Sequence, residues 1–557
     1  MNEVIIVKPD KCQGCNACIR ACPAPEANVV KVLEDGRMVV NVNPDKCIAC
    51  GECVRTCVHD ARDYIDDTEA CMQRLETDKI IILATPSIKS ALPRQWKGVL
   101  DWFKKKGCLV YDVSFGADIC TWAHLRAIES KQVGNVISQP CAAIVRYIET
   151  YQPKLLQNIS PIHSPILCSA TYIRKYQRRT NPIAVLSPCI AKKMEFTDTG
   201  LVDYNVTIKK LMEYFDKNEI RIPAAPVTDF DYDFDDTQGQ LGGIYPRPGG
   251  LKDCLLAHDP DLNIVTAEGV QSVYGQLDTY AAIGDNKHPQ VFDVLSCEFG
   301  CNSGPGTGTK QNNFDMLAVM KQVRDNAESK RKGGGLFGRG EDRLFKQFDD
   351  ELQLQDFIRH YKPGVMSVIP NDNQLEEVYI RMGKDTPEKR KHDCHACGYK
   401  SCRDMAIAIY RGINIPENCI VHEHDVLQTS STELSVDNTR LAEITSDCID
   451  ISEKLKSNVS EINENMEVIK GSNSKTSTRA TEVNDLLQSV IEFCNANSTM
   501  DEESVTQLVE ILATTQKAFK SLDKNVTRTN ESSEAINESI VRIGGLVDEI
   551  KTVLART

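Results

Sequence analysis

The middle of the chain alternates short, wholly apolar runs with longer segments in which apolar residues recur at helical spacing. Residues 80–84 form such a run, as expected for a strand buried on both faces. Residues 142–156 instead have the spacing of a helix with one apolar side. The alternation starts at Lys79 and continues to about residue 370, interrupted by a basic, glycine-rich stretch at 330–340 that predicts a loop. This pattern predicts an α/β domain.

The first 66 residues follow a different pattern. An apolar stretch, Val29–Val42, is broken in its middle by Glu34-Asp35-Gly36. Because Asp-Gly between alternating apolar residues is a strong turn signal, this stretch predicts a β-hairpin. A cysteine run lies on each side of it.

The last 134 residues, from about His424, contain no proline, and their apolar residues recur three or four positions apart. The first series is Ile444, Cys448, Ile451, Leu455, Val459, Ile462, Met466 and Ile469, and the second is Val505, Leu508, Leu512, Phe519, Leu522, Val526, Ile536, Ile540, Ile543, Val547 and Ile550. This spacing puts a narrow apolar seam on a long helix, which needs a partner helix. Ser498–Glu502 has the composition of a helix cap and predicts the start of the second helix.

We interpret this tail as an antiparallel helical hairpin that pairs with a second chain; a simple dimerising stalk is the alternative. It resembles the signalling hairpins of methyl-accepting chemotaxis proteins in texture. Since the signature tip sequence of those proteins is missing, we do not infer binding to chemotaxis kinases.

Composition excludes several classes of protein. The chain has 65 basic and 79 acidic residues and a formal charge of -14, which argues against a nucleic-acid partner. No apolar run is long enough to span a bilayer. The N-terminal segment lacks the basic region of a signal peptide and soon enters a cysteine motif, so we expect a cytoplasmic protein.

The 23 cysteines are concentrated in a few places, and clustered cysteines in a reducing compartment usually bind metal. Eight of them form two runs with the spacing C-x2-C-x2-C-x3-C: Cys12, Cys15, Cys18 and Cys22, then Cys47, Cys50, Cys53 and Cys57. These runs resemble bacterial two-cluster ferredoxins, in which the fourth cysteine of each run binds the other cluster. The resemblance implies two [4Fe-4S] clusters, one on Cys12, Cys15, Cys18 and Cys57 and one on Cys47, Cys50, Cys53 and Cys22. A zinc site is the alternative.

Four more cysteines lie far apart in the α/β region, in proline- and glycine-rich surroundings: Cys141, Cys189, Cys297 and Cys301. Their thiolates suffice for one further cluster, and their spacing alone says no more.

The segments around these four cysteines resemble the three signature motifs of [FeFe]-hydrogenases, over roughly residues 80–370. The resemblance implies that the four cysteines bind the cubane of an H-cluster, with Cys301 bridging to a di-iron subsite that carries CO, cyanide and azadithiolate. Lys192 matches the family lysine that donates a hydrogen bond to a cyanide, Glu195 would hold that lysine, and Thr85, Pro86 and Ser87 would line the dithiolate side.

The departures from the family pattern predict slow chemistry. Catalytic members relay protons through a cysteine at the position of Pro140, and proline has no titratable group. Ser187 and Leu295 replace two methionines, and the glutamates of the usual proton path are missing from Trp122–Glu129, although Ser160 is kept. Cys168 is a candidate for another proton route, with an inert buried thiol as the alternative.

A late cysteine group has the spacing C-x2-C-x4-C-x16-C: Cys394, Cys397, Cys402 and Cys419. Between the last two a helix is predicted over Arg403–Gly412. The group resembles a small [4Fe-4S] module of sensory hydrogenases, with a structural zinc site as the alternative. Its place before the helical tail suggests a relay whose charge biases the helices. The isolated Cys71, Cys108, Cys120, Cys254, Cys448 and Cys494 are expected to be structural.

The sequence therefore predicts four domains: a two-[4Fe-4S] ferredoxin domain of α+β class (1–77), an α/β H-cluster domain (78–385), a small [4Fe-4S] module (386–423) and an all-α coiled-coil hairpin (424–557). The expected function is that of a slow [FeFe]-hydrogenase of the sensory-type branch, interconverting H2 with protons and electrons. Its expected partners are a redox protein such as ferredoxin, a signalling protein and a second copy of the chain. The alternatives are a turnover-competent hydrogenase with an unusual proton path, an electron-transfer protein lacking the di-iron subsite, and an iron–sulfur reductase of another small molecule.

Overall fold

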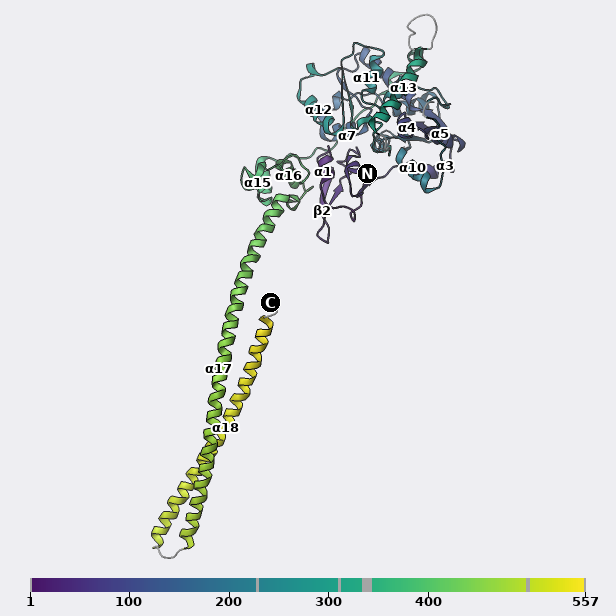
Figure 1. Cartoon of the computed structure of the whole chain (residues 1–557). Coiled ribbons are helices and arrows are strands. Elements are labelled where there is room, and N and C mark those ends of the chain that lie inside the picture. The colour runs from purple at the N-terminus through teal and green to yellow at the C-terminus, as the bar shows by residue number, and fades with distance from the viewer. Residues whose placement is uncertain (1–2, 227–229, 309–311, 333–342, 497–500, 555–557) are drawn as a thin grey trace. The chain divides into compact units, whose positions relative to one another are not determined.

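The structure is a computed structural model, and it describes residues 3–226, 230–308, 312–332, 343–496 and 501–554 (Figure 1). The chain separates into two compact units, Met1–Glu423 and His424–Thr557. None of the helices in the described ranges is both long enough and apolar enough to cross a membrane.

Two short antiparallel strand pairs and two short helices form the N-terminal part of the first unit. The elements are β1 (Ile5–Val7) paired with β4 (Arg62–Tyr64), β2 (Asn28–Val32) paired with β3 (Met38–Val42), α1 (Ala17–Ala21) and α2 (Glu52–Thr56). The β2–β3 pair is the predicted hairpin, with Gly36 in its turn at φ +81°. Each helix starts inside a cysteine run from a residue of positive φ, Asn16 at 60° and Gly51 at 78°, residue types that tolerate this conformation.

Two parallel sheets form the centre of the following region. One has the order β6 (Leu109–Asp112), β5 (Ile81–Ala84), β8 (Ile183–Ser187), β9 (Tyr204–Thr207), and the other the order β10 (Ile264–Glu268), β11 (Val291–Leu295), β7 (Val136–Ile137). Every residue of β5, β8 and β11 is buried, which is why these strands are continuous apolar runs in the sequence. The alternating pattern thus gives parallel strands, as predicted for an α/β region.

Helices cover these sheets, and the cysteines follow the strand ends. The helices are α3 (Thr68–Leu75), α4 (Ser87–Ala91), α5 (Trp96–Lys105), α6 (Val113–Glu129), α7 (Ala142–Tyr151), α8 (Pro165–Thr171), α9 (Lys192–Thr199), α10 (Ile208–Lys217), α11 (Gly250–Leu256), α12 (Val270–Ala282), α13 (Asn313–Lys332) and α14 (Arg343–Glu351). Cys189 comes two residues after β8 and Cys297 two residues after β11, while Cys141 immediately precedes α7. Since the carboxyl ends of parallel strands line one edge of a sheet, the topology brings distant cysteines together.

Two features of this region differ from or extend the predictions. The helix predicted over residues 142–156 ends at Tyr151, and a short 3-10 turn, Pro153–Asn158, follows it, because proline cannot continue the helical hydrogen bonding. The stretch 330–340 begins as the last turn of α13, and its remaining residues lie outside the described ones.

The late cysteines belong to a small helical module beside the N-terminal part. It contains α15 (Asp372–Arg381) and α16 (Cys402–Tyr410), which covers most of the helix predicted over Arg403–Gly412. Figure 1 shows α15 and α16 next to α1 and β2. One backbone hydrogen bond joins the two parts directly, from the Val30 amide of β2 to the carbonyl of Ile413 (2.9 Å).

The second unit consists of α17 (Ile420–Ala496), whose first residues lie in the first unit, and α18 (Glu502–Leu554). Side-chain hydrogen bonds pair the two helices in antiparallel order: Gln488 with Gln516, Ser477 with Asp523 and Asn473 with Asn530. Asp501 caps α18 by accepting from the Ser504 amide (2.7 Å), whereas residues 498–500 of the predicted cap lie outside the described ones.

Candidate functional site

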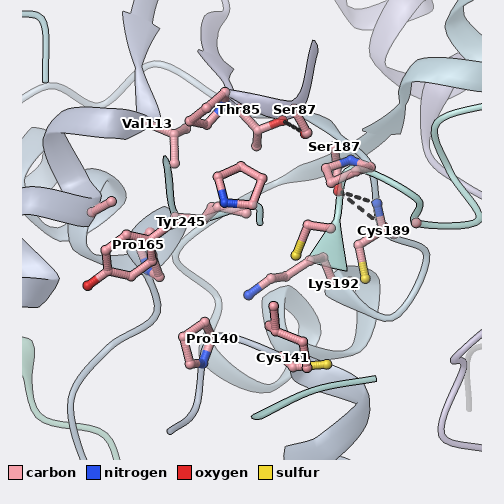
Figure 2. A pocket seen from close by; sticks show the side chains of 18 of the residues that line it. Thr85, Ser87, Val113, Pro140, Cys141, Pro165, Ser187, Cys189, Lys192 and Tyr245 are labelled. Atoms are coloured by element: carbon pink, nitrogen blue, oxygen red, sulfur yellow. Dashed lines mark hydrogen bonds between the residues drawn. The ribbon is translucent and has the colours of Figure 1, made fainter. Parts of the chain in front are cut away.

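A cavity with an empty volume of about 780 Å3 lies where the cysteine-bearing segments of the α/β region meet. Cys141, Cys189, Cys297 and Cys301 all line it, together with Thr85, Pro86, Ser87, Pro140, Pro165, Ser187, Lys192, Tyr245 and Leu295. Figure 2 shows the Lys192 ammonium extending into the middle of this cavity, toward the space between Pro140 and Ser187. The distant cysteines and the lysine singled out from the sequence therefore share one site.

Burial and neighbouring sulfurs raise the pKa values of three of the four thiols, those of Cys189, Cys297 and Cys301. Burial raises the pKa of Cys189 to about 11, and repulsion from Cys141 adds to the shift. Burial and the neighbouring sulfurs also raise the pKa values of Cys297 and Cys301. Such thiols become thiolates only beside strong positive charge, which an iron–sulfur cluster supplies. The donor set thus fits a cubane.

Lys192 is held by a buried ion pair. Its Nζ donates to Glu195 Oε2 (2.6 Å), and the two side chains are 8% and 1% exposed. Arg359 Nη1 donates to the other oxygen of the same carboxylate (3.2 Å), and Ser164 Oγ donates to Oε2 (3.0 Å). One buried carboxylate therefore orients two cations, and only Lys192 reaches the cavity.

Several hydroxyl groups that line the cavity are hydrogen-bonded to the backbone. Thr85 Oγ1 donates to the carbonyl of Leu186 (2.6 Å) and shares a hydrogen bond with Ser87 Oγ (2.9 Å). Ser187 Oγ accepts from the amide of Cys189 (3.0 Å), which fixes the loop that carries this cysteine. These contacts hold both strand ends in one arrangement.

A cluster of buried titratable groups lies near the wall formed by Pro140. His124 of α6 shares a hydrogen bond with Ser160 Oγ through Nε2 (2.8 Å), and its Nδ1 lies 2.8 Å from the backbone oxygen of Cys120. Cys120 and Cys168 both donate to the carbonyl of His163, at 3.3 and 3.4 Å. Burial acts to raise the pKa of Cys120, but hydrogen bonding to Cys168 and the charge of His124 outweigh it, so this pKa is lowered. Cys168 thus packs into a polar cluster, and burial raises its pKa.

The two N-terminal cysteine runs form a second set of sites. A cavity of about 300 Å3 is lined by Cys22, Cys47, Cys50 and Cys53, the ligand set expected for one cluster. The helices of the two runs, α1 and α2, pack against each other. Of the other expected set, Cys12 and Cys15 lie near enough to Cys18 to influence its ionisation.

The second run lies against the main cavity. The backbone of Gly51 is so close to the loop after Cys301 that a Cβ there would lie 2.6 Å from Pro305. Tyr274 lies between the sites: the charges of Cys50, Cys141 and Cys297 all act on it, and its hydroxyl bonds to Ser296 Oγ (2.8 Å). The fold thus brings the Cys47–Cys53 site beside the four-cysteine cavity.

The late cysteines surround a cavity of their own. Cys394, Cys397, Cys402 and Cys419 line an empty volume of about 310 Å3. Burial raises the pKa of Cys397, and the charges of the other three sulfurs add to the shift. Among the described residues, no group of three or more His, Cys, Asp or Glu side chains is arranged to hold a single metal ion. Four thiols around a cavity are a donor set that fits a cubane.

Comparison with known families adds independent evidence. Residues 79–305 match the family model of the iron-only hydrogenase large subunit, C-terminal domain. Residues 4–58 match a 4Fe-4S dicluster domain, and residues 391–421 match an Fe-S cluster family. Three consecutive parts of the chain are therefore similar to a 4Fe-4S dicluster domain, an iron-only hydrogenase domain and a short Fe-S cluster segment, in that order.

Individual relatives are similar to parts of the chain. Iron hydrogenase 1 of Clostridium pasteurianum is 23% identical over 248 residues, covering 35% of this chain and 42% of the relative. The chain thus spans about two fifths of the length of this curated relative. An [FeFe]-hydrogenase structure determined at a stage of H-cluster assembly, and that of a variant [FeFe]-hydrogenase from Chlamydomonas reinhardtii, are each 13% identical with a TM-score of 0.40, covering 54% of this chain and 99% of theirs.

Sequence reasoning missed several residues that organise these sites. Arg359 joins Glu195 from a distant segment, and no motif surrounds it. Cys120, expected to be only structural, belongs to the buried cluster with His124. Asn16 and Asn418 bond to each other between two cysteine groups. Their positions next to Cys15 and Cys419 were the only sequence signal.

Proposed function

We propose that this protein is a slow [FeFe]-hydrogenase that interconverts H2 with two protons and two electrons and acts as a hydrogen or redox sensor. One observation carries the proposal: four thiols from separate segments line a single cavity together with Lys192. The iron-only hydrogenase domain match over residues 79–305 supports it. Cysteine clusters persist where thiols stay reduced, which supports a cytoplasmic protein.

The residues of the cavity have distinct proposed roles. When bound, an H-cluster supplies the iron at which hydrogen reacts. Lys192 presents an ammonium suited to hold an anionic cyanide ligand, because charge-assisted hydrogen bonds are strong in a dry site. Glu195 positions that ammonium, and Thr85 and Ser87 offer hydroxyl groups to the dithiolate side. Pro140, with no proton to give, makes slow proton transfer the expected limit on turnover.

Infrared spectra and turnover test this proposal together. After anaerobic maturation, the wild type should show bands of iron-bound CO and cyanide and evolve hydrogen slowly. Pro140→Cys should raise the rate, since it adds a thiol at the cavity wall, whereas the control Pro140→Ala changes the same position without adding a proton donor. Absent bands would leave the electron-transfer alternative. A wild type that is already fast, with no gain in Pro140→Cys, would favour the turnover-competent alternative.

A second candidate function is that of a turnover-competent hydrogenase. The buried Cys120–His124 cluster is the observation that favours it. It holds two titratable groups and Ser160 in hydrogen-bond contact on one side of the domain. A fast wild type that slows in His124→Gln would identify this cluster as the unusual proton path.

The second unit supports the proposed dimer and signalling role. Of the predicted seam residues, Ile444 and Ile451 are 51% and 64% exposed, although Val526, Ile540 and Val547 are buried. A partly exposed seam is what a helix pair retains when it associates with a second pair. Sedimentation should therefore show a dimer that Ile451→Asp disrupts.

Two results would count against this role. The control Val468→Asp changes an apolar residue that is 71% exposed but lies off the predicted seam, and its sedimentation should match the wild type. Equal disruption by both variants would contradict the seam. Identical amide exchange of residues 424–557 in oxidised and reduced protein would contradict the proposed signal.

In this proposal the four predicted domains divide the work. Residues 1–77 carry electrons on two [4Fe-4S] clusters, residues 78–385 react with hydrogen, residues 386–423 hold a further [4Fe-4S] cluster and residues 424–557 report to a signalling partner. The close approach of Gly51 to Pro305 supports electron transfer between residues 1–77 and residues 78–385. A ferredoxin is the class of external redox partner that fits such clusters.

A further inference from the structure

A buried pair of amides connects the late cysteine module to the first ferredoxin run. Asn16 Nδ2 donates to Asn418 Oδ1 (2.7 Å), and Asn418 Nδ2 donates back to Asn16 Oδ1 (3.3 Å). Asn16 follows Cys15 and Asn418 precedes Cys419, so each amide is the chain neighbour of an expected cluster ligand. Both residues are 7% exposed. The amide pair is therefore largely shielded from solvent.

Further contacts surround the amide pair. Arg20 Nη2 donates to the carbonyl of His395 (3.3 Å), and Asn16 Nδ2 also reaches the carbonyl of Ala396 (3.4 Å). Gly398, which follows Cys397, packs so tightly that an added Cβ would lie 2.8 Å from Cβ of Ile19. The backbone between two late cysteines thus touches the helix between two cysteines of the first run.

The interface is also anchored at its edge. Arg411 Nη1 donates to Glu26 Oε1 (2.9 Å), and the side chains of this ion pair are 18% and 10% exposed. The backbone bond from Val30 to Ile413 continues the contact. The reciprocal amide pair favours one relative position of the late module and the first ferredoxin run. In any shifted position each buried amide would lose its hydrogen-bond partner.

From these contacts we infer that the late module exchanges electrons with the cluster site of the first ferredoxin run, and that Asn16 and Asn418 are the positioning residues that set this exchange. The order of sites is then the main cavity, the Cys47–Cys53 site, the first-run site and the late module. With clusters bound at both sites, one electron would pass from a reduced first-run cluster to an oxidised late cluster, with no proton or other reactant. This order deepens the proposed function and rests on it for the source of electrons.

The test uses full-length protein in which the cubanes are assembled but the di-iron subsite is left out. Chemical reduction replaces hydrogen as the electron source, so failure of the proposed hydrogenase activity cannot affect the result. Electron paramagnetic resonance of the fully reduced wild type should show magnetic interaction between the late cluster and a ferredoxin cluster. Rapid freezing after mixing with a reductant should show the late cluster filling together with the first-run cluster.

Two variants locate the exchange. The double variant Asn16→Leu with Asn418→Leu removes both amides at once and leaves neither unpaired; it should weaken the magnetic interaction and slow filling of the late cluster severalfold. Glu376→Gln, which breaks only the Arg390–Glu376 pair on the surface of the late module, is the matched control and should behave as wild type. Circular dichroism and iron content verify that both variants fold and load.

A second variant covers the case in which the double variant fails to fold. Cys15→Ser should alter the first-run cluster and, with it, the filling of the late cluster. The inference is overturned if the late cluster fills at the wild-type rate in Cys15→Ser, if its spectrum shows no interaction with another cluster, or if the late site binds zinc.

Discussion

Replacing Glu195 should destabilise the α/β region more than replacing Lys192, the residue that it holds. Glu195→Gln leaves the Lys192 ammonium and the Arg359 guanidinium, each 8% exposed, without their shared carboxylate. Breaking a buried pair in this way costs about 3–5 kcal/mol, because an uncompensated charge stays buried. Lys192→Met instead leaves the carboxylate bonded to Arg359 and Ser164, so its cost should be the loss of one charged hydrogen bond, about 1.5–3 kcal/mol.

Guanidinium unfolding followed by tryptophan fluorescence measures both variants. Trp96, Trp102 and Trp122 are the 3 tryptophans of the chain and all lie within residues 79–305, so the signal reports on this domain. The midpoint should fall further in Glu195→Gln at an unchanged slope. As a control, Asp325→Asn breaks the exposed Lys321–Asp325 pair and should cost about 0–1 kcal/mol. If Glu195→Gln cost no more than that control, the carboxylate would not be what holds the two cations.

Three further predictions concern pH dependence and packing. Burial lowers the pKa of His163 to about 4 from 6.5, so the unfolded chain binds more protons between these values. Stability should therefore fall as the pH drops through this window, by up to about 3 kcal/mol, and His163→Gln should remove that slope from denaturation midpoints. Burial raises the pKa of Asp293 to about 6 from 3.8, so the native state binds more protons than the unfolded chain between these values. The contribution of Asp293 to stability should therefore fall as the pH rises through this window. Asp293→Asn should remove this dependence from the denaturation midpoints measured over the same pH range. Gly116→Ala would push a Cβ into the carbonyl of Pro165 where α6 meets α8, so it should lower the melting temperature. A melting temperature equal to that of the wild type would show that α8 can move aside.

Local patterns in the sequence were sufficient to predict much of the fold. The apolar run at 80–84 becomes β5 and the Asp-Gly turn joins β2 to β3, because period and turn chemistry act over a few residues. Cysteine spacing within a run also marks a cluster loop, since the ligands of one cubane come from neighbouring residues.

Contacts between distant segments could not be predicted in this way. Arg359 reaches Glu195 across 164 positions, and Asn16 reaches Asn418 across 402. No local sequence pattern marks these Asn and Arg residues. Their partners are determined by how whole elements pack. For the four separated cysteines, family resemblance supplied a grouping that spacing alone left open, and the structure brings their side chains to one cavity.

The tight approach of Gly51 to Pro305 has a consequence for the spacing of the two cysteine sites on either side of it. At φ +78° and with no room for a Cβ, this glycine lets the Cys47–Cys53 loop approach the loop after Cys301 closely. A larger residue there would have to displace the loop after Cys301. The separation between the Cys47–Cys53 site and the four-cysteine cavity is therefore set in part by one backbone position.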